Sequence, residues 1–195
     1  MRLVRLFLAF VVLLVFGWSS GASAVPIQWT VAEGGNGHWY EFFYNQMNWH
    51  AASSFAQSQS HEGQAGHLAT ITSLDERNFI VAAGLVPDIP AGNPWIGAYQ
   101  DTSAPDYAEP GGGWRWVTGE EWGFESWNAG EPNDSPYDEN FAALYPHGDW
   151  IDLQSFWGHY RVLVEYETNP IPEPSTALLL GLGLVGMAAG RRRIR

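Results

Sequence analysis

The 195-residue chain contains no cysteine. This absence excludes disulfide bonds, a thiol nucleophile and a thiolate metal site, although export to an oxidising compartment would permit disulfides. Stability must therefore come from buried apolar surface. The chain has 11 Trp, 8 Tyr and 10 Phe, and each buried aromatic side chain removes a large apolar area from water. We expect an aromatic-rich core.

Basic residues are scarce in the middle of the chain. All nine are arginine, and six of them lie at the two ends. Only Arg77, Arg115 and Arg161 fall between residues 25 and 171, a stretch that holds 20 of the 21 Asp and Glu residues because only Glu173 lies outside it. So acidic a domain disfavours nucleic acid as a partner and favours cations or neutral surfaces such as glycans.

Long apolar runs occur only near the ends of the chain. Residues 1–24 combine a basic start, an apolar run over residues 6–16 and the small-residue segment Ala22-Ser23-Ala24, which is the pattern of a secretory signal peptide. We expect the mature chain to begin near Val25. A single membrane anchor is the alternative, but about eleven apolar residues fall short of the ~20 that cross a bilayer.

The C-terminal segment, residues 170–195, has three parts in order. A Pro172-Glu173-Pro174 motif precedes an apolar stretch over residues 177–190, and four arginines follow within the last five residues. This order favours a short membrane-inserted helix with the arginines on the cytoplasmic side. It resembles the PEP-CTERM sorting signal of Gram-negative bacteria, which implies processing by an exosortase after export and association with exopolysaccharide or biofilm matrix. A permanent tail anchor is the alternative.

Residues 25–169 have the length of one domain and predict an α+β fold with antiparallel strands. Strand patterns cover residues 37–44, 67–72, 95–99, 140–145, 150–153 and 160–166. A helix capped by Asn48 and a second that begins with a capping box from Ser73 to Glu76 lie between the first three. Residues 101–138 predict a long loop, and its aromatic residues favour an ordered one.

Seven landmarks in this domain resemble the C-type lectin-like domain, from about Gly37 to Glu167. The resemblance implies two helices, antiparallel sheets and a long ordered loop, here without disulfides. The landmarks are W-x-x-A at 49–52, G-H-L-A-T-I at 66–71, W-I-G at 95–97, W-x-W-V-T-G at 114–119, E-P-N at 131–133, W-x-D at 150–152 and V-E-Y-E at 164–167.

The loop segment E-P-N-D-S-P-Y-D-E-N, residues 131–140, holds four carboxylates and two amides with no basic residue. Two carboxylates about 4 Å apart repel by roughly 4 kcal/mol at an effective dielectric near 20. A cation would offset this repulsion, and Ca²⁺ takes six to eight oxygen ligands of this kind. The residues themselves therefore favour a calcium site.

The family resemblance assigns ligands to such a site. It implies that Glu131, Asn133, Glu139 and Asp152 bind one Ca²⁺, which also accepts two vicinal hydroxyls of a mannose-type or glucose-type sugar. It further implies sugar contacts from the first three of these residues and a cis peptide bond before Pro132.

One position departs from the family pattern. Ile151 stands where the sugar-binding members have the Asn of a W-N-D triplet, so one oxygen ligand and one amide donor are missing. A second calcium site, implied for Asp134 with Glu139, would draw on Asp101 or Asp106, although a solvated acidic loop is the alternative there.

Other chemistries fit the residues less well. His61 and His67 frame a segment similar to a zinc-protease helix, but Ala65 stands where the second histidine belongs, and no carboxylate pair stands out for glycoside hydrolysis. We therefore expect no enzyme. Two functions remain: an exported carbohydrate-binding module that uses calcium, or a structural or protein-binding matrix domain without sugar activity. The aromatic residues at 122, 124 and 127 would either stack on a sugar or fill the core.

Overall fold

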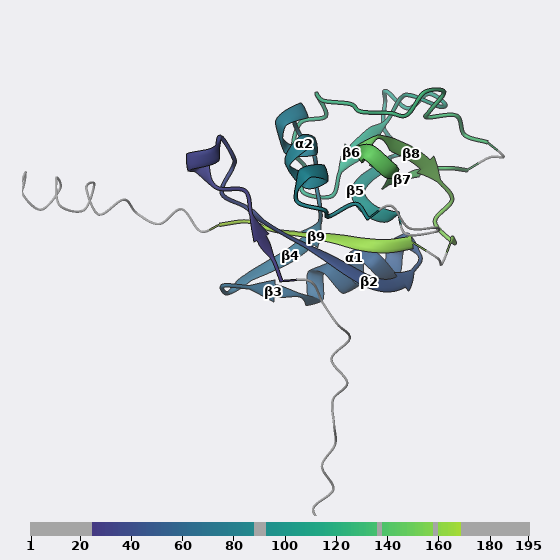
Figure 1. The fold of residues 1–195 in the computed structure, drawn as a ribbon. Coiled ribbons are helices and arrows are strands. Elements are labelled where there is room, and N and C mark those ends of the chain that lie inside the picture. The colour runs from purple at the N-terminus through teal and green to yellow at the C-terminus, as the bar shows by residue number, and fades with distance from the viewer. Residues whose placement is uncertain (1–24, 88–92, 136–137, 158–159, 169–195) are drawn as a thin grey trace, which may run out of the picture.

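The computed structural model describes residues 25–87, 93–135, 138–157 and 160–168. These residues form one domain with two α-helices and a large sheet (Figure 1). The strands are β1 (Ile27–Gln28), β2 (Trp39–Met47), β3 (Ser60–His61), β4 (Gln64–Leu68), β5 (Pro94–Gln100), β6 (Trp114–Trp116), β7 (Phe141–Leu144), β8 (Trp150–Leu153) and β9 (Tyr160–Tyr166). The helices are α1 (Trp49–Ser58), α2 (Leu74–Ala82) and the short 3₁₀ turns η1 (Val31–Glu33) and η2 (Pro146–Gly148).

The sheet has the strand order β1-β2-β9-β5-β7-β8. β4 adds to β9, β3 pairs with β4, and β6 pairs with β5. The pairs between described strands are antiparallel except for β5 and β9, which run parallel with Trp95 opposite Val162. The α+β class predicted from the sequence is confirmed. The sequence predicted antiparallel strands, and the parallel pair of β5 and β9 differs from that prediction.

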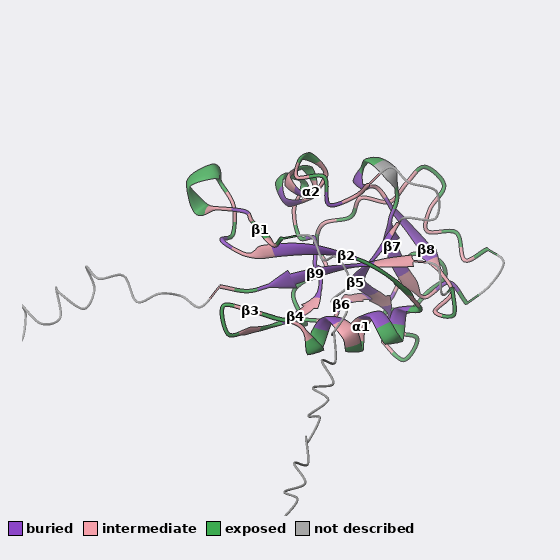
Figure 2. Cartoon of the chain, turned by 60° about the horizontal axis from the view of Figure 1, so that its bottom comes forward, coloured by how far each residue is buried: buried purple, intermediate pink, exposed green. Residues whose placement is uncertain are grey.

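The two α-helices lie on opposite faces of the central strands, as Figure 1 shows with α2 above and α1 below. Alternate residues of a strand point to opposite faces. Tyr40 and Phe42 of β2 therefore pack in the α2-side cluster, and Phe43 packs in the α1-side cluster. Figure 2 shows that α1 turns its exposed residues away from this sheet. The core thus has two apolar layers, and Trp95, Trp114, Trp116 and Trp150 are fully buried in them.

Both helix starts follow the predicted caps. The Asn48 side chain accepts the amide of Ala51, and the Ser73 hydroxyl accepts the amide of Glu76 at 3.2 Å. The second half of the capping box is different: the Glu76 carboxylate accepts from the amide and hydroxyl of Thr72. The strand expected at residues 67–72 also ends earlier, at Leu68. The Ala69 amide still donates to the Leu163 carbonyl of β9, but the amides of Thr70 and Thr72 bind the carboxylates of Glu165 and Glu76 instead of a neighbouring strand.

Gly97 lies at the point where β5 comes closest to the segment after β4. Its amide donates to the carbonyl of Ala69 at 2.8 Å, and a Cβ at Gly97 would stand 2.7 Å from the Leu68 carbonyl oxygen. This contact explains why the W-I-G motif ends in glycine, since only a residue without a side chain permits so close an approach.

The long loop between β5 and β7 is ordered around an aromatic cluster. Trp122 lies near Trp114, Trp116 and Trp150, with ring centroids 4.9 to 6.1 Å apart. Phe124 and Trp127 also pack against the buried α2-side cluster. Of the two roles considered for the aromatic residues at 122, 124 and 127, these contacts support the filling of the core.

Within the described ranges, no helix is both long enough and apolar enough to cross a membrane. The expected signal peptide at residues 1–24 and the expected sorting segment with its membrane helix at residues 170–195 lie outside the described residues.

Candidate functional site

Asp152 anchors the E-P-N segment to the sheet. It lies on β8 opposite Ala142 of β7 and is 3% exposed. Its carboxylate accepts the amide of Asn133 at 3.0 and 3.1 Å and the amide of Asp134 at 2.8 Å. Because a buried carboxylate needs such donors, the strand residue and the loop backbone stabilise each other.

Glu131 and Asn133 lie beside this anchor. The peptide bond between Glu131 and Pro132 is cis, as the family resemblance implied. The side-chain amide of Asn133 donates to the Glu131 carboxylate, and the Glu131 backbone amide donates to Asn128 at 2.9 Å. Two of the four proposed ligands are therefore in direct contact with each other.

Glu139 closes the same loop from its other end. It is 6% exposed, and its carboxylate accepts the amide of Ser135 at 3.1 Å. Its own amide donates to the Asp134 carboxylate at 3.1 Å. The structure thus brings together the four residues expected to bind calcium, with Asp134 linking Glu139 to the Asp152 end.

The cluster raises the pKa values of two of its carboxyl groups, those of Glu131 and Glu139. Partial burial, a hydrogen bond shared with Asp152 and the charges of Asp152 and Glu139 raise the pKa of Glu131 to about 7. Burial and the charge of Asp152 likewise raise the pKa of Glu139 to about 7. A cation close to these oxygens would favour the ionised form of both side chains and so lower both pKa values. The nearest charge partners of Arg77 and Arg115 are Asp149 and Asp106 instead.

The donor set suits calcium in its chemistry, since it consists of carboxylate and amide oxygens. It is not preformed: within the described parts of the chain, no three acidic, histidine or cysteine side chains are arranged to hold a metal ion. The Asn133 side-chain amide donates to the Glu131 carboxylate, and the backbone that carries Asn133 is held by Asp152.

The chain is similar to known lectins over most of its length. Lectoxin-Lio1 of Erythrolamprus poecilogyrus, a C-type lectin, is 31% identical over 149 residues, which cover 73% of this chain and 83% of that protein. The C-type lectin CEL-I from Cucumaria echinata has the same fold, with a TM-score of 0.56 at 21% identity over 69% of this chain and 93% of that one.

This chain belongs to the C-type lectin-like family. The relatives that place it there are lectins by name and not enzymes, in agreement with the expectation of a binding protein. Residues 170–193 match the PEP-CTERM protein-sorting motif, so the predicted sorting segment is confirmed as well.

Some relatives of this lectin-like chain are much longer. Halomucin of Haloquadratum walsbyi is 33% identical over 146 residues, which cover 67% of this chain and 1% of halomucin. The chain also spans only 60% and 40% of two further lectins that it matches. What these longer proteins do as a whole is therefore a separate matter from what this domain does.

The departure at Ile151 has a structural explanation in this lectin-like domain. Ile151 is 8% exposed and packs in the α1-side apolar cluster. Since successive strand residues point to opposite faces, the side chain before Asp152 turns away from the E-P-N loop. The chain therefore has a core-packing residue at the position where the family resemblance implies an asparagine.

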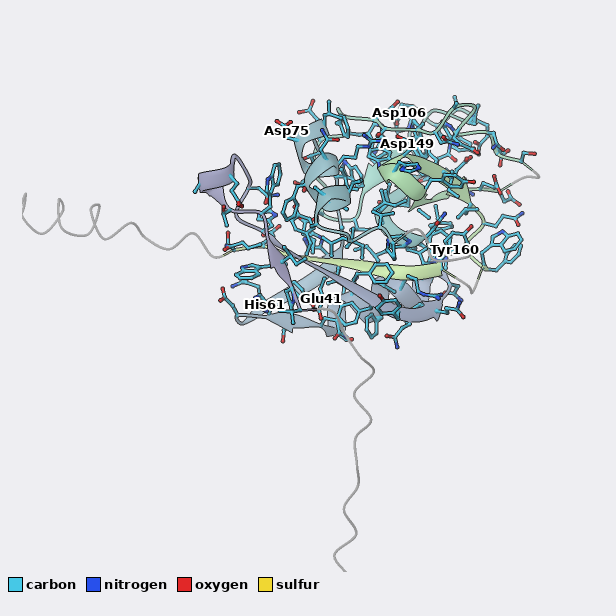
Figure 3. All side chains as sticks on the ribbon, in the orientation of Figure 1. Glu41, His61, Asp75, Asp106, Asp149 and Tyr160 are labelled. Carbon is cyan, nitrogen blue, oxygen red and sulfur yellow. The ribbon has the colours of Figure 1, made fainter. Side chains whose placement is uncertain are left out.

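The second calcium site remains a prediction for Asp134 and Asp101. Asp101 accepts from the amide and hydroxyl of Ser103 at 2.9 and 2.6 Å, and Asp106 pairs with Arg115. Figure 3 shows Asp106 at the upper edge of the domain, among the exposed loops. These two residues have partners of their own, whereas Asp134 is part of the main cluster.

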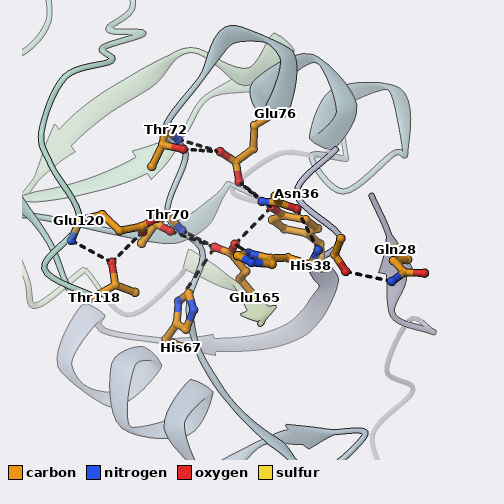
Figure 4. Close-up of polar contacts among 12 residues, drawn as sticks. Gln28, Asn36, His38, His67, Thr70, Thr72, Glu76, Thr118, Glu120 and Glu165 are labelled. Atoms are coloured by element: carbon orange, nitrogen blue, oxygen red, sulfur yellow. Dashed lines mark hydrogen bonds and ion pairs between the residues drawn. The ribbon is translucent and has the colours of Figure 1, made fainter. Parts of the chain in front are cut away.

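The structure contains a second acidic cluster, formed by Glu76 and Glu165, that the sequence analysis did not predict. Glu76 of α2 and Glu165 of β9 are 2% and 1% exposed, and the Tyr40 hydroxyl lies between them, 2.5 Å from Glu76 and 3.2 Å from Glu165. Figure 4 shows the two carboxylates with their amide and hydroxyl donors, including Thr70 and Thr72. The signal in the sequence was Glu165 directly after the apolar run Val162-Leu163-Val164 of β9, because a carboxylate buried there needs hydrogen-bond donors.

Proposed function

We propose that this chain is an exported module that binds carbohydrate through a Ca²⁺ ion held by Glu131, Asn133, Glu139 and Asp152. The observation that carries the proposal is the convergence of these four residues at β8, where Asp152 holds the loop backbone through two amides. Membership of the lectin-like family supports the same reading.

Each residue has a distinct task in this proposal. Asp152 fixes the loop and supplies a ligand oxygen, and Glu139 supplies a second carboxylate from the far end of the loop. Glu131 and Asn133 lie side by side, so their carboxylate and amide can contact two neighbouring hydroxyls of a sugar as acceptor and donor. The calcium ion itself would accept those hydroxyl oxygens.

The sorting motif suggests where the module works. Export, transient membrane insertion of residues 177–190 and processing by an exosortase-type enzyme would deliver the domain to the cell envelope or its surroundings. Its partner there would be a carbohydrate of the exopolysaccharide or biofilm matrix. The acidic domain suits a neutral glycan better than a nucleic acid.

Isothermal titration of the mature domain with mannose, glucose and the producer's exopolysaccharide tests the proposal. We expect binding in millimolar calcium and none in chelator. Asp152→Asn should weaken both calcium and sugar binding, whereas the control Asp75→Asn, an exposed acidic residue in the first turn of α2, should leave both unchanged. Absence of heat with all three ligands in calcium would refute the proposal.

The alternative is a matrix domain of the same fold that binds no sugar. It is favoured by two features: the Asn133 amide is already bound to Glu131, and Ile151 contributes no oxygen. Calcium would then raise the melting temperature through the carboxylates alone, since an ion that binds only the folded state stabilises it, and sugars would add nothing to that rise.

A further inference from the structure

Two aromatic side chains stand in solvent in the turn that follows β8. Phe156 is 68% exposed and Trp157 is 43% exposed. The turn is closed by a hydrogen bond from the Trp157 amide to the Gln154 carbonyl at 3.3 Å. In contrast, Trp122, Phe124 and Trp127 of the long loop pack against the core. Phe156 and Trp157 therefore expose apolar ring surface to solvent instead of burying it in the core.

The two rings are nearly parallel. Their planes are inclined by 16° and their centroids lie 6.2 Å apart. Ring atoms in contact are about 3.5–4 Å apart, so a larger centroid separation means that the rings are displaced sideways. Each ring therefore leaves part of its face uncovered. We call this pair, Phe156 and Trp157, the aromatic ledge.

The aromatic ledge and Glu139 lie at the same end of the β7–β8 pair. Phe141 of β7 pairs with Leu153 of β8. Glu139 comes two residues before Phe141 and the ledge begins three residues after Leu153, and an antiparallel pairing places these two positions at one end. On the other side of the turn, burial and the charge of Glu139 raise the pKa of Tyr160. Figure 3 places Tyr160 at the loop end of β9.

The base of the turn is fixed to the rest of the domain. The Ser155 carbonyl accepts the amide of Trp49 at the start of α1, at 3.1 Å. A stacking surface on an anchored turn loses less conformational freedom on binding than one on a free loop.

We propose that the aromatic ledge is a stacking subsite for a second pyranose ring of a glycan whose first ring is held at the acidic cluster. The inference rests on the proposed function and adds the ligand class: a β-linked glucose-type chain. In such a ring all hydroxyls are equatorial, so both faces present only C–H groups. These faces match an aromatic surface, while the ring edges remain free for polar contacts.

The charge of the domain argues against a membrane as the occupant. The stretch from residue 25 to 171 carries 20 acidic residues and three arginines. Anionic lipid surfaces attract basic segments and repel acidic ones. A neutral saccharide carries no such penalty.

Titration of the calcium-loaded domain with glucose and with cellotriose tests the subsite. We expect cellotriose to bind about tenfold more tightly than glucose, which equals about 1.4 kcal/mol. Trp157→Ala and Trp157→Leu should both remove this advantage, because leucine keeps apolar surface but has no flat face. Trp157→Phe should retain most of it, and Val31→Ala, an exposed apolar residue on η1, serves as the control.

Three outcomes would overturn the proposal, and each one identifies a different failure. If Trp157→Leu binds cellotriose as tightly as the wild type while glucose still binds, the aromatic ledge is not a subsite and the proposed function stands. If neither sugar binds in calcium, both proposals fail. If Trp157→Ala reduces binding to phosphatidylcholine vesicles and leaves the sugar affinities unchanged, the ledge contacts lipid and the proposal is wrong.

Discussion

The imidazole of His38 lies with Nδ1 2.6 Å from Oε1 of the buried Glu165. This contact ends a chain of hydrogen bonds that runs from Glu165 through the Tyr40 hydroxyl to Glu76. Asn36 donates to both Tyr40 and Glu76. The chain therefore joins the loop before β2, the strands β2 and β9 and the start of α2, which are the parts on the α2 side of the sheet.

This cluster predicts that the domain in chelator is more stable at pH 5 than at pH 8. The hydrogen bond to Glu165 raises the pKa of His38 above its ordinary 6.5, and burial with the charge of Glu165 raises that of Glu76 to about 6. The folded state thus holds more protons than the unfolded state. The stabilisation from His38 is complete below pH 6.5, and that from Glu76 below pH 4.5. Each is lost as pH rises through its folded pKa.

Urea unfolding of the wild type and His38→Gln at both pH values measures this effect. Loss of a hydrogen bond to a charged partner should destabilise the variant by about 1–3 kcal/mol at pH 5 and by less at pH 8. Other groups facing the pair are Tyr40, His67 from β4 and Glu167. A stability that rises from pH 5 to pH 8 in both proteins would contradict the assignment.

Calcium affinity should fall as the pH drops through about 7. Without calcium, the pKa values of Glu131 and Glu139 are both about 7, so protons compete with the ion for these oxygens below that pH. Calcium titrations at pH 8, 7 and 6 should show weaker binding at each step, with protons released on binding near pH 7. Glu139→Gln should bind calcium more weakly at pH 8, and an affinity independent of pH would rule out these two ligands.

Ile151→Asn should lower stability rather than restore a family ligand. Ile151 packs among apolar residues with 8% exposure, and an unpaired buried amide costs about 1–3 kcal/mol by the evidence of protein variants. Urea unfolding measures this loss, and Ile151→Val, which stays apolar, should cost less. An unchanged unfolding midpoint together with tighter calcium binding would show that the side chain at 151 faces the loop after all.

Gly97→Ala should also destabilise the domain, by about 1–3 kcal/mol, because overpacking displaces neighbouring atoms. The new Cβ would meet the Leu68 carbonyl oxygen at 2.7 Å and a methyl of Val117 at 2.8 Å. Gly123→Ala is the matched control, since nothing lies within 4 Å of a Cβ there. Thermal melts of the two variants should differ clearly, and equal midpoints would show that β5 and the segment after β4 can separate at little cost.

Local sequence patterns were sufficient for the helix starts and most strands. Asn48 and Ser73 cap their helices through hydrogen bonds within a few residues, so the sequence carries the whole interaction. The E-P-N loop was recognisable because so many carboxylates without basic partners need a cation. The early end of β4 was not foreseeable, since the amides of Thr70 and Thr72 bind Glu165 and Glu76, and the first of these lies 95 residues away.

The sequence by itself determined the resemblance to the family and the acidic composition of the E-P-N loop, because these depend on residue type and order along the chain. Only the tertiary structure decided which aromatic rings are buried and which stand free at the ledge of Phe156 and Trp157. It also decided that Ile151 turns into the core and that Glu165 and Glu76 share one tyrosine hydroxyl. Burial and pairing across the fold are properties of packing between distant segments, and no local pattern encodes them.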